Sequence, residues 1–410
     1  MISFREYDPQ WHIQDAALLW KEVGWLRPGV HENDLHAWLA SCSGLISDHA
    51  GRPECVAMAL SGNLRYLLRD IPLSIVAAVI TGYPARCGGL AAKLTTQLLA
   101  RERIRGALVS SLGMFEQGYY NRLGFGSGCY EHFVSFDPSR IRVNARPRPC
   151  VRLERKDLPR LHESRLRRLR RHGSINIENP DFTFWRGVNP AGGFGLGYEC
   201  DDGTISHHLW LHPDNDRADS FTVSWLAFSN MTQFLELLAL VKSLASQWNL
   251  ATIMEPPGIQ MQDVLDHPIR NRIISRNSDY EQNIRSRAWW QCRILDMRGC
   301  LKLTALPVDE FRFHLTLSDP IEEFLDRREP WSGESGEYVV TLGPECDIRQ
   351  GVDRSLPTLA CSIGAFTRMW LGALPASGLA VTDDLYGLPE LLEKLDRAFA
   401  LPRPLPDWLF

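Results

Sequence analysis

Several patterns are missing from this 410-residue sequence, and each absence narrows the function. No run approaches 18 uninterrupted apolar residues, and residues 1–6 bring an acid and no apolar core, so we expect neither a membrane span nor a signal peptide. A large charge of one sign is also missing. The formal net charge of −4 gives no general attraction to nucleic acid or to an anionic membrane. We therefore expect a cytoplasmic protein that binds no nucleic acid and no membrane.

Cysteine and histidine clusters at metal-binding spacing are missing too. The ten cysteines are scattered, with no C-x-x-C pair, and we interpret them as reduced and mostly buried thiols. The nearest group of metal-ligand types is His207, His208 and His212. In an alternating strand the first two of these point to opposite faces, so the sequence predicts no metal site.

The commonest phosphate loops are absent, yet one glycine turn remains. Residues 76–81 form a short β-branched run that ends at Gly82, and leucines recur every four residues from Leu90 in a helix-like pattern. The turn between them, 86–91, lacks both the Lys-Ser/Thr of a Walker loop and the three glycines of a Rossmann turn. Glycine allows close backbone approach, and the first N–H groups of a helix are unpaired. The turn can therefore hold an anion such as a diphosphate.

A second motif begins about thirty residues further along the chain. Residues 107–112 predict the next strand, after a helix stop at Gly106. The segment 115–126 follows and contains two adjacent tyrosines ahead of Asn-Arg-Leu-Gly-Phe-Gly. Taken alone, either tyrosine could simply be an amphipathic residue at the edge of a core.

The R-x-x-G-x-A turn and the later Y-x-R-x-G-F-G segment together resemble the GNAT superfamily of acyl-CoA-dependent N-acyltransferases. The resemblance implies that Tyr120, better placed than Tyr119, protonates the departing CoA sulfur. The family's second and third basic positions in the turn are Cys87 and Gly88 here, which weakens the expected grip on phosphate. The implied contacts to acetyl-CoA are Val79, Ile80, Thr81, Arg86, Cys87, Gly88, Gly89, Leu90, Ala91, Ala92, Phe115 and Glu116.

The chain length predicts two or three domains. Prolines crowd the stretch before residue 150 and favour a boundary there. Residues 193–248 repeat the order of strand then helix, but their joint at 229–232 has no glycine, so this second unit should not hold the cofactor. From Trp289 the pattern resembles a sterol-carrier-protein-like fold. We predict an α+β protein with a catalytic GNAT-like domain at 1–145, a degenerate GNAT-like domain at 146–287 and a sterol-carrier-protein-like domain at 288–410.

Two further features leave alternatives open. The tryptophans among the first fifty residues, Trp11, Trp20, Trp25 and Trp38, could line an amine pocket or pack in a core. The densest basic run, 157–172, predicts a helix with one apolar side. A solvated face or subunit contact is the default interpretation of its arginines, and contact with a CoA phosphate or nucleic acid is the alternative.

Over its full length the chain resembles the enhanced intracellular survival (Eis) family of acetyl-CoA-dependent aminoglycoside and lysine N-acetyltransferases. The resemblance implies that the terminal carboxylate of Phe410 enters the active site as a base, and the proline-stiffened apolar ending suits docking. Burial would raise the pKa of that carboxylate and make it a better base. Leu409 replaces the acid that Eis-like pockets carry before the last residue, and Asp407 is the candidate substitute. The resemblance also implies a homo-oligomer, either a hexamer or a smaller ring.

These features predict direct transfer of an acetyl group from acetyl-CoA to a primary amine. The acceptor would be an aminoglycoside, a polyamine or a peptide lysine. The alternative is a non-catalytic acyl-CoA or lipid-binding protein, in which the third domain holds an apolar ligand.

Overall fold

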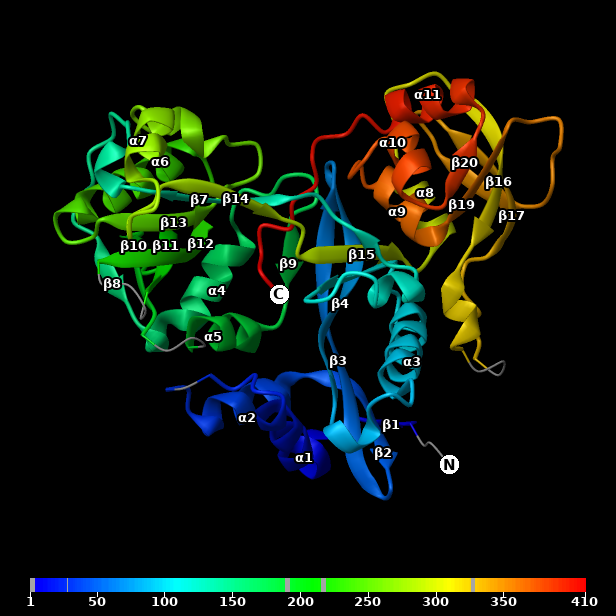
Figure 1. Cartoon of the computed structure of the whole chain (residues 1–410), viewed down its shortest axis with the longest axis horizontal. Helices are drawn as coiled ribbons and strands as arrows, with labels where there is room; N and C mark the ends of the chain where they lie inside the picture. The colour runs from blue at the N-terminus through cyan, green and yellow to red at the C-terminus, as the bar shows by residue number, and fades with distance from the viewer. Residues whose placement is uncertain (1–3, 28, 189–191, 215–218, 326–328) are drawn as a thin grey trace.

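The structure is a computed structural model that describes residues 4–27, 29–188, 192–214, 219–325 and 329–410. Three mixed sheets, each packed against helices, organise the chain, which confirms the predicted α+β class. In Figure 1 the first sheet lies at the centre and bottom, the second forms the left-hand lobe and the third the upper right-hand lobe. Within the described ranges, no helix is both long and apolar enough to cross a bilayer.

The first sheet has eight strands in the order β1-β2-β3-β4-β5-β15-β6, with β9 paired to β3. Strands β4 and β5 run parallel and are joined through a helix, α3, while the other neighbours are antiparallel. The strands are β1 (Phe4–Glu6), β2 (Ser43–His49), β3 (Arg52–Tyr66), β4 (Arg69–Thr81), β5 (Val109–Gly113), β6 (Gly126–Ser127), β9 (Ile175–Ile177) and β15 (Trp290–Ile294). The helical segments around it are α1 (Pro9–Glu22), α2 (Glu32–Ser41), η1 (Tyr83–Ala85), α3 (Leu90–Ile104) and η2 (Tyr120–Leu123).

Strand β3 is continuous, although Ser61-Gly62 resembles a turn in the sequence. A methyl group built on Gly62 would overlap the main-chain oxygen of Asn176 in β9. The glycine therefore permits close approach of a neighbouring strand, which is a common reason for glycine inside a strand.

The second sheet has seven strands in the order β14-β7-β13-β12-β11-β10-β8. Strands β12 and β13 run parallel and are joined through α6, so the unit repeats the β4-α3-β5 arrangement. Its strands are β7 (Glu131–Phe136), β8 (Val151–Leu153), β10 (Phe194–Glu199), β11 (Ile205–Pro213), β12 (Ser220–Ala227), β13 (Leu250–Met254) and β14 (Asn283–Arg287). The helical segments are η3 (Pro138–Arg140), η4 (Arg155–Asp157), α4 (Leu158–Leu166), α5 (Pro180–Val188), α6 (Met231–Ser243), η5 (Leu244–Ser246), η6 (Met261–Val264) and α7 (Pro268–Ser275).

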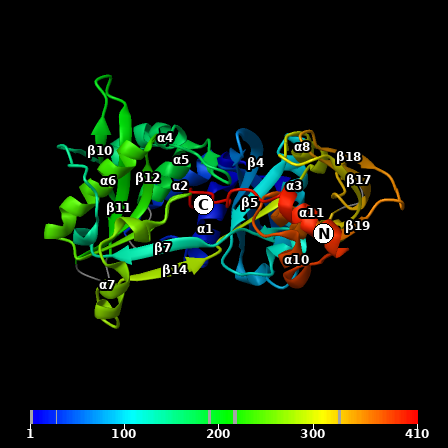
Figure 2. The same cartoon turned by 90° about the horizontal axis from the view of Figure 1, so that it is seen from above.

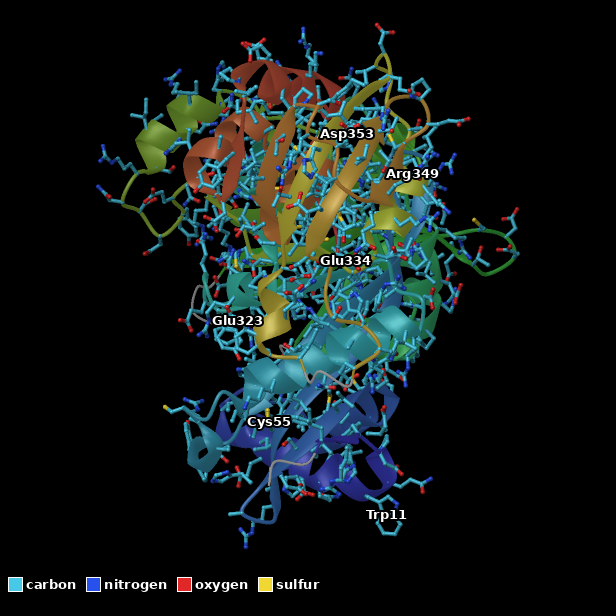
Figure 3. All side chains as sticks on the ribbon, turned by 90° about the vertical axis from the view of Figure 1, so that its right-hand side faces the viewer. Trp11, Cys55, Glu323, Glu334, Arg349 and Asp353 are labelled. Atoms are coloured by element: carbon cyan, nitrogen blue, oxygen red, sulfur yellow. The ribbon has the colours of Figure 1, made fainter. Side chains whose placement is uncertain are left out.

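The third sheet has five strands in the order β18-β17-β16-β19-β20. Its strands are β16 (Phe311–Ser318), β17 (Gly336–Leu342), β18 (Asp347–Gln350), β19 (Thr358–Ser362) and β20 (Leu385–Gly387). Its helical segments are α8 (Met297–Lys302), η7 (Pro320–Glu323), α9 (Ile363–Trp370), α10 (Ala376–Thr382) and α11 (Pro389–Ala398). Figure 3 shows this sheet with Arg349 and Asp353 near the top of the view, and Cys55 of the first sheet well below them. The sterol-carrier-protein-like assignment of this unit stays a prediction.

Sheet membership crosses the predicted domain ranges at three strands. Strand β9 lies within 146–287 but pairs with β3 of the first sheet. Strand β7 lies within 1–145 but pairs with β13 and β14 of the second sheet. Strand β15 lies within 288–410 but pairs with β5 and β6 of the first sheet. The first sheet thus contains strands from all three predicted ranges, because hydrogen bonding of these short segments is decided by distant partners and not by their own sequence.

The basic run at 157–172 differs from the predicted solvated helix. Helix α4 ends at Leu166, and Arg165 and Arg168 are only 3% and 7% exposed. Arg168 pairs with Asp407, 2.5 Å away in the C-terminal segment. Arg165 and Arg168 are buried because this part of the run holds the end of the chain, so these two are not available to bind nucleic acid, whereas Arg167 and Arg171 are exposed.

Candidate active site

Strands β4 and β5 diverge at the point where the sequence predicts a ligand cleft. Their parallel pairing begins at Leu73 and stops at Val76. The register of β4 against β3 shifts just after that residue, at Ala77, so a bulge turns β4 away from β5. Beyond the bulge, β4 has no strand partner on its β5 side among the described residues. Its main-chain groups there are available to a ligand, and Val79, Ile80 and Thr81 belong to this stretch.

The glycine turn leads into α3, and no described side chain binds the first N–H groups of that helix. Gly89 precedes the helix with φ of 68°, a left-handed conformation that suits glycine, and no side chain caps the first N–H groups. Arg86, Cys87, Gly88 and Gly89 are all exposed. The next three predicted contacts, Leu90, Ala91 and Ala92, form the first turn of α3, where Leu90 and Ala92 are buried. The turn can therefore present main-chain N–H groups and the positive end of the helix dipole to an anion.

Tyr120 begins η2 and packs near this cleft. It is 6% exposed and belongs to the same apolar cluster as Leu90 and Ala92. Its ring meets Tyr119 edge-on at 4.9 Å between centroids, and its hydroxyl has no hydrogen-bond partner within the described residues. Burial raises the pKa of Tyr120, and the neighbouring Tyr119 adds to the shift. The phenol therefore stays protonated at neutral pH, as a proton donor must.

The loop around Tyr120 is fixed by partners that sequence reasoning missed. Asn121 accepts from the Gly118 N–H at 3.0 Å and from the Gln291 amide of β15 at 3.0 Å. Arg293, also in β15, donates to the carbonyl oxygen of Leu123 and forms a fully buried ion pair of 2.7 Å with Asp319. Strand β15, which comes from the third predicted range, thus supports the segment that carries the candidate acid.

One of the early tryptophans contacts the segment predicted to bind the cofactor. Trp25 meets Phe115 edge-on at 6.4 Å between centroids, and Phe115 is 76% exposed beside the exposed Glu116. Trp20 and Trp38 pack in the core, where Trp20 contacts Trp25. Trp11 is exposed and points away from the body in Figure 3. A role of Trp25 in an amine pocket stays a prediction.

The C-terminus reaches the end of β5. A methyl group built on Gly113, the last residue of β5, would overlap the main-chain oxygen of Phe410. Phe410 is half-buried against the large apolar cluster, and none of the described cationic side chains forms an ion pair with its carboxylate. Figures 1 and 2 both place the terminus near the middle of the molecule. The carboxylate that the resemblance implied as a base thus lies where β4 and β5 separate.

The segment before Phe410 is held tightly. Trp408 is 1% exposed, and the guanidinium carbon of Arg165 lies 3.9 Å from the centre of its ring. Pro406 accepts from the Ile175 N–H of β9 at 2.9 Å. Asp407, the candidate pocket acid, is instead bound to Arg168, so its carboxylate anchors the segment.

Comparisons with known proteins find similar structures but no similar sequences. No protein-family model matches the sequence, and no curated protein is similar to it. Among solved structures, a probable N-acyltransferase from Enterococcus faecalis superposes with a TM-score of 0.80 and 13% identity. A GCN5-related N-acetyltransferase from Anabaena variabilis gives 0.77 and 15%, and Eis1 from Mycobacterium abscessus gives 0.74 and 14%. Each match covers 100% of both chains. At such low identity the likeness shows the fold alone, and the shared fold extends over the whole chain.

Proposed function

We propose that this protein is an acetyl-CoA-dependent N-acetyltransferase that acts on a primary amine by direct transfer. The observation that supports it best is the divergence of β4 from β5 after Val76, next to an uncapped helix start at Gly89. A strand edge can hold the pantetheine arm through main-chain hydrogen bonds, and the helix start can hold the diphosphate. The residues present therefore suit acetyl-CoA as a substrate.

The terminal carboxylate and the phenol give the transfer its two proton steps. The Phe410 carboxylate takes a proton from the substrate ammonium, directly or through a water molecule, and frees the amine. The amine nitrogen attacks the thioester carbonyl carbon, whose oxygen is polarised by main-chain N–H groups of β4 beyond Ala77. A C–N bond forms, the C–S bond breaks, and Tyr120 donates its proton to the leaving sulfur. The nitrogen then gives up its second proton, which passes through solvent to the Tyr120 phenolate, so that the products are a neutral amide and the CoA thiol.

The test combines acetyl-CoA titration calorimetry with a thiol-release assay on aminoglycosides, polyamines and peptide lysines. We expect acetyl-CoA to bind and at least one amine of this panel to release thiol. Tyr120→Phe should lower turnover by about 10²–10⁴-fold and leave acetyl-CoA affinity nearly unchanged. Binding without release for any amine would favour the non-catalytic acyl-CoA or lipid-binding alternative. The hexamer or smaller ring stays a prediction, which light scattering of the full chain can test.

A further inference from the structure

A cavity of about 50 Å³ lies in the second sheet, where β12 and β13 separate. The parallel pairing of these strands stops at Val223, and the register of β12 against β11 shifts at Ser224. In the first sheet β4 separates from β5 in the same way: the parallel pairing stops at Val76, and a bulge follows. The second unit therefore keeps the cleft-forming geometry of the first, although its joint has no glycine.

The second cleft has lost the means to hold a diphosphate. Asn230 caps α6 by accepting from the Gln233 N–H at 3.0 Å. The Gln233 side chain in turn accepts from the Ser229 N–H at 2.7 Å. The Asn230 cap occupies one of the helix-start donors, whereas no side chain in the described ranges caps the start of α3. A ligand of the second cleft must be recognised in another way.

The cavity wall combines apolar side chains with arginines. Trp225, Leu226, Phe228, Met254 and Leu409 supply apolar surface. This wall suits a short hydrocarbon chain, because apolar surface removed from water stabilises a complex. A water molecule needs about 10–15 Å³ of free cavity volume, so this cavity could hold roughly three to five waters. The buried part of the ligand is therefore small.

The cavity wall carries more positive than negative charge, because its lining contains three arginines and one aspartate. Arg168 is paired with Asp407, but Arg165, 3% exposed, donates only to the Thr183 hydroxyl at 3.0 Å among the described residues. Burial lowers the pKa of Arg165, and the charge of Arg168 lowers it further. Arg171 adds an exposed cation to the lining. A buried guanidinium without a carboxylate partner is costly. The rings of Trp225 and Trp408, whose centres lie 4.4 and 3.9 Å from the guanidinium carbon of Arg165, offset part of that cost, and an anionic ligand would offset more of it.

We propose that this cavity is a second, non-catalytic ligand site for a small carboxylate with a short apolar chain. The carboxylate binds Arg165, and the chain lies against Trp225 and Met254. Asp407 and Leu409 also line the cavity, so an occupant touches the segment that carries the terminal carboxylate. The site goes beyond the proposed transfer reaction, since its occupancy can be measured without acetyl-CoA or an amine.

Titration calorimetry on the full chain tests the proposal with hexanoate as the probe and with hexylamine and hexanol as matched compounds. We expect hexanoate to bind and hexylamine not to bind. Arg165→Met should weaken hexanoate binding by about tenfold or more, because it removes a charge-assisted hydrogen bond. Arg171→Met, at an exposed position, should weaken it by a smaller factor. The control Arg167→Met changes an exposed arginine of the same segment outside the cavity wall and should have no effect.

A second route covers the case in which Arg165→Met does not fold, as judged by circular dichroism. Leu226 is a half-buried wall residue, so Leu226→Trp fills the cavity from its rim and should abolish hexanoate binding. Three results would overturn the proposal: equal binding of hexylamine, no hexanoate binding at millimolar concentration, or hexanoate binding that survives the wall variants. The last result would place the ligand elsewhere in the chain.

Discussion

Gly113→Ala is the smallest change that tests the role assigned to the terminal carboxylate. The backbone of Gly113 is not left-handed, so alanine can adopt it without strain, and its methyl group would meet the main-chain oxygen of Phe410. Carbon and oxygen atoms in contact lie roughly 3.5 Å apart, so the terminus must retreat by on the order of 1 Å. A displacement of about 1 Å at a reacting group can cost about 10²-fold in rate, or about 2.7 kcal/mol. We therefore expect turnover to fall by about that factor.

The assay is steady-state thiol release, with acetyl-CoA affinity measured separately by calorimetry. Affinity should change by less than about threefold, because the diphosphate donors lie in the turn before α3 and not at Gly113. The matched control is Gly378→Ala, where the built methyl group makes only an ordinary contact of 3.4 Å with Pro375. A chain that lacks Phe410 completes a double-mutant cycle, and in it Gly113→Ala should cost nothing more. Near-normal turnover of Gly113→Ala, or a further loss in the shortened chain, would refute the reasoning.

Three other predictions concern the same segment and its surroundings. Adding a few residues after Phe410 should abolish thiol release and leave the melting temperature unchanged; normal turnover of the extended chain would exclude a terminal base. Asp407→Asn breaks a buried ion pair with Arg168, which typically costs about 3–5 kcal/mol, so turnover and the free energy of unfolding should both fall. The control Asp347→Asn removes an exposed ion pair and should change the free energy of unfolding by less than about 1 kcal/mol. Burial raises the pKa of Glu131 to about 7, so the folded chain binds that proton more tightly than the unfolded chain and loses stability as pH rises from about 4.5 through 7. Denaturant unfolding of Glu131→Gln should show up to about 3 kcal/mol more stability than the parent at pH 8 and little difference at pH 4, and equal pH profiles would contradict this.

The local parts of the cleft could be predicted from the sequence. The strand before Gly82, the glycine turn and the helix from Leu90 lie next to one another in the chain, so their periodicity and turn residues predict them directly. The segment that begins at Tyr120 follows β5 for the same reason. The bulge at Ala77 carries no such signal, because it depends on register against β3.

The long-range parts could not be predicted from local patterns. Strand β15 looks like the start of the third unit, yet it completes the first sheet. The run of arginines from Arg165 looks like a solvated face, because the sequence does not show that Asp407 and Trp408 return to cover it. In both cases the local sequence pattern is overridden by contacts with residues that are about 180 or more positions away in the chain.

The late position of β15 in the chain has a consequence for how the protein forms during synthesis. The edge of β5 is complete only when β15 pairs with it, and about 180 residues separate Gly113 from Ile294. At roughly 5–20 residues per second, that edge waits about 10–40 s on the ribosome before its partner is made. An unpaired edge is a template for aggregation in the meantime, so expression of a fragment that stops before β15 should yield insoluble protein.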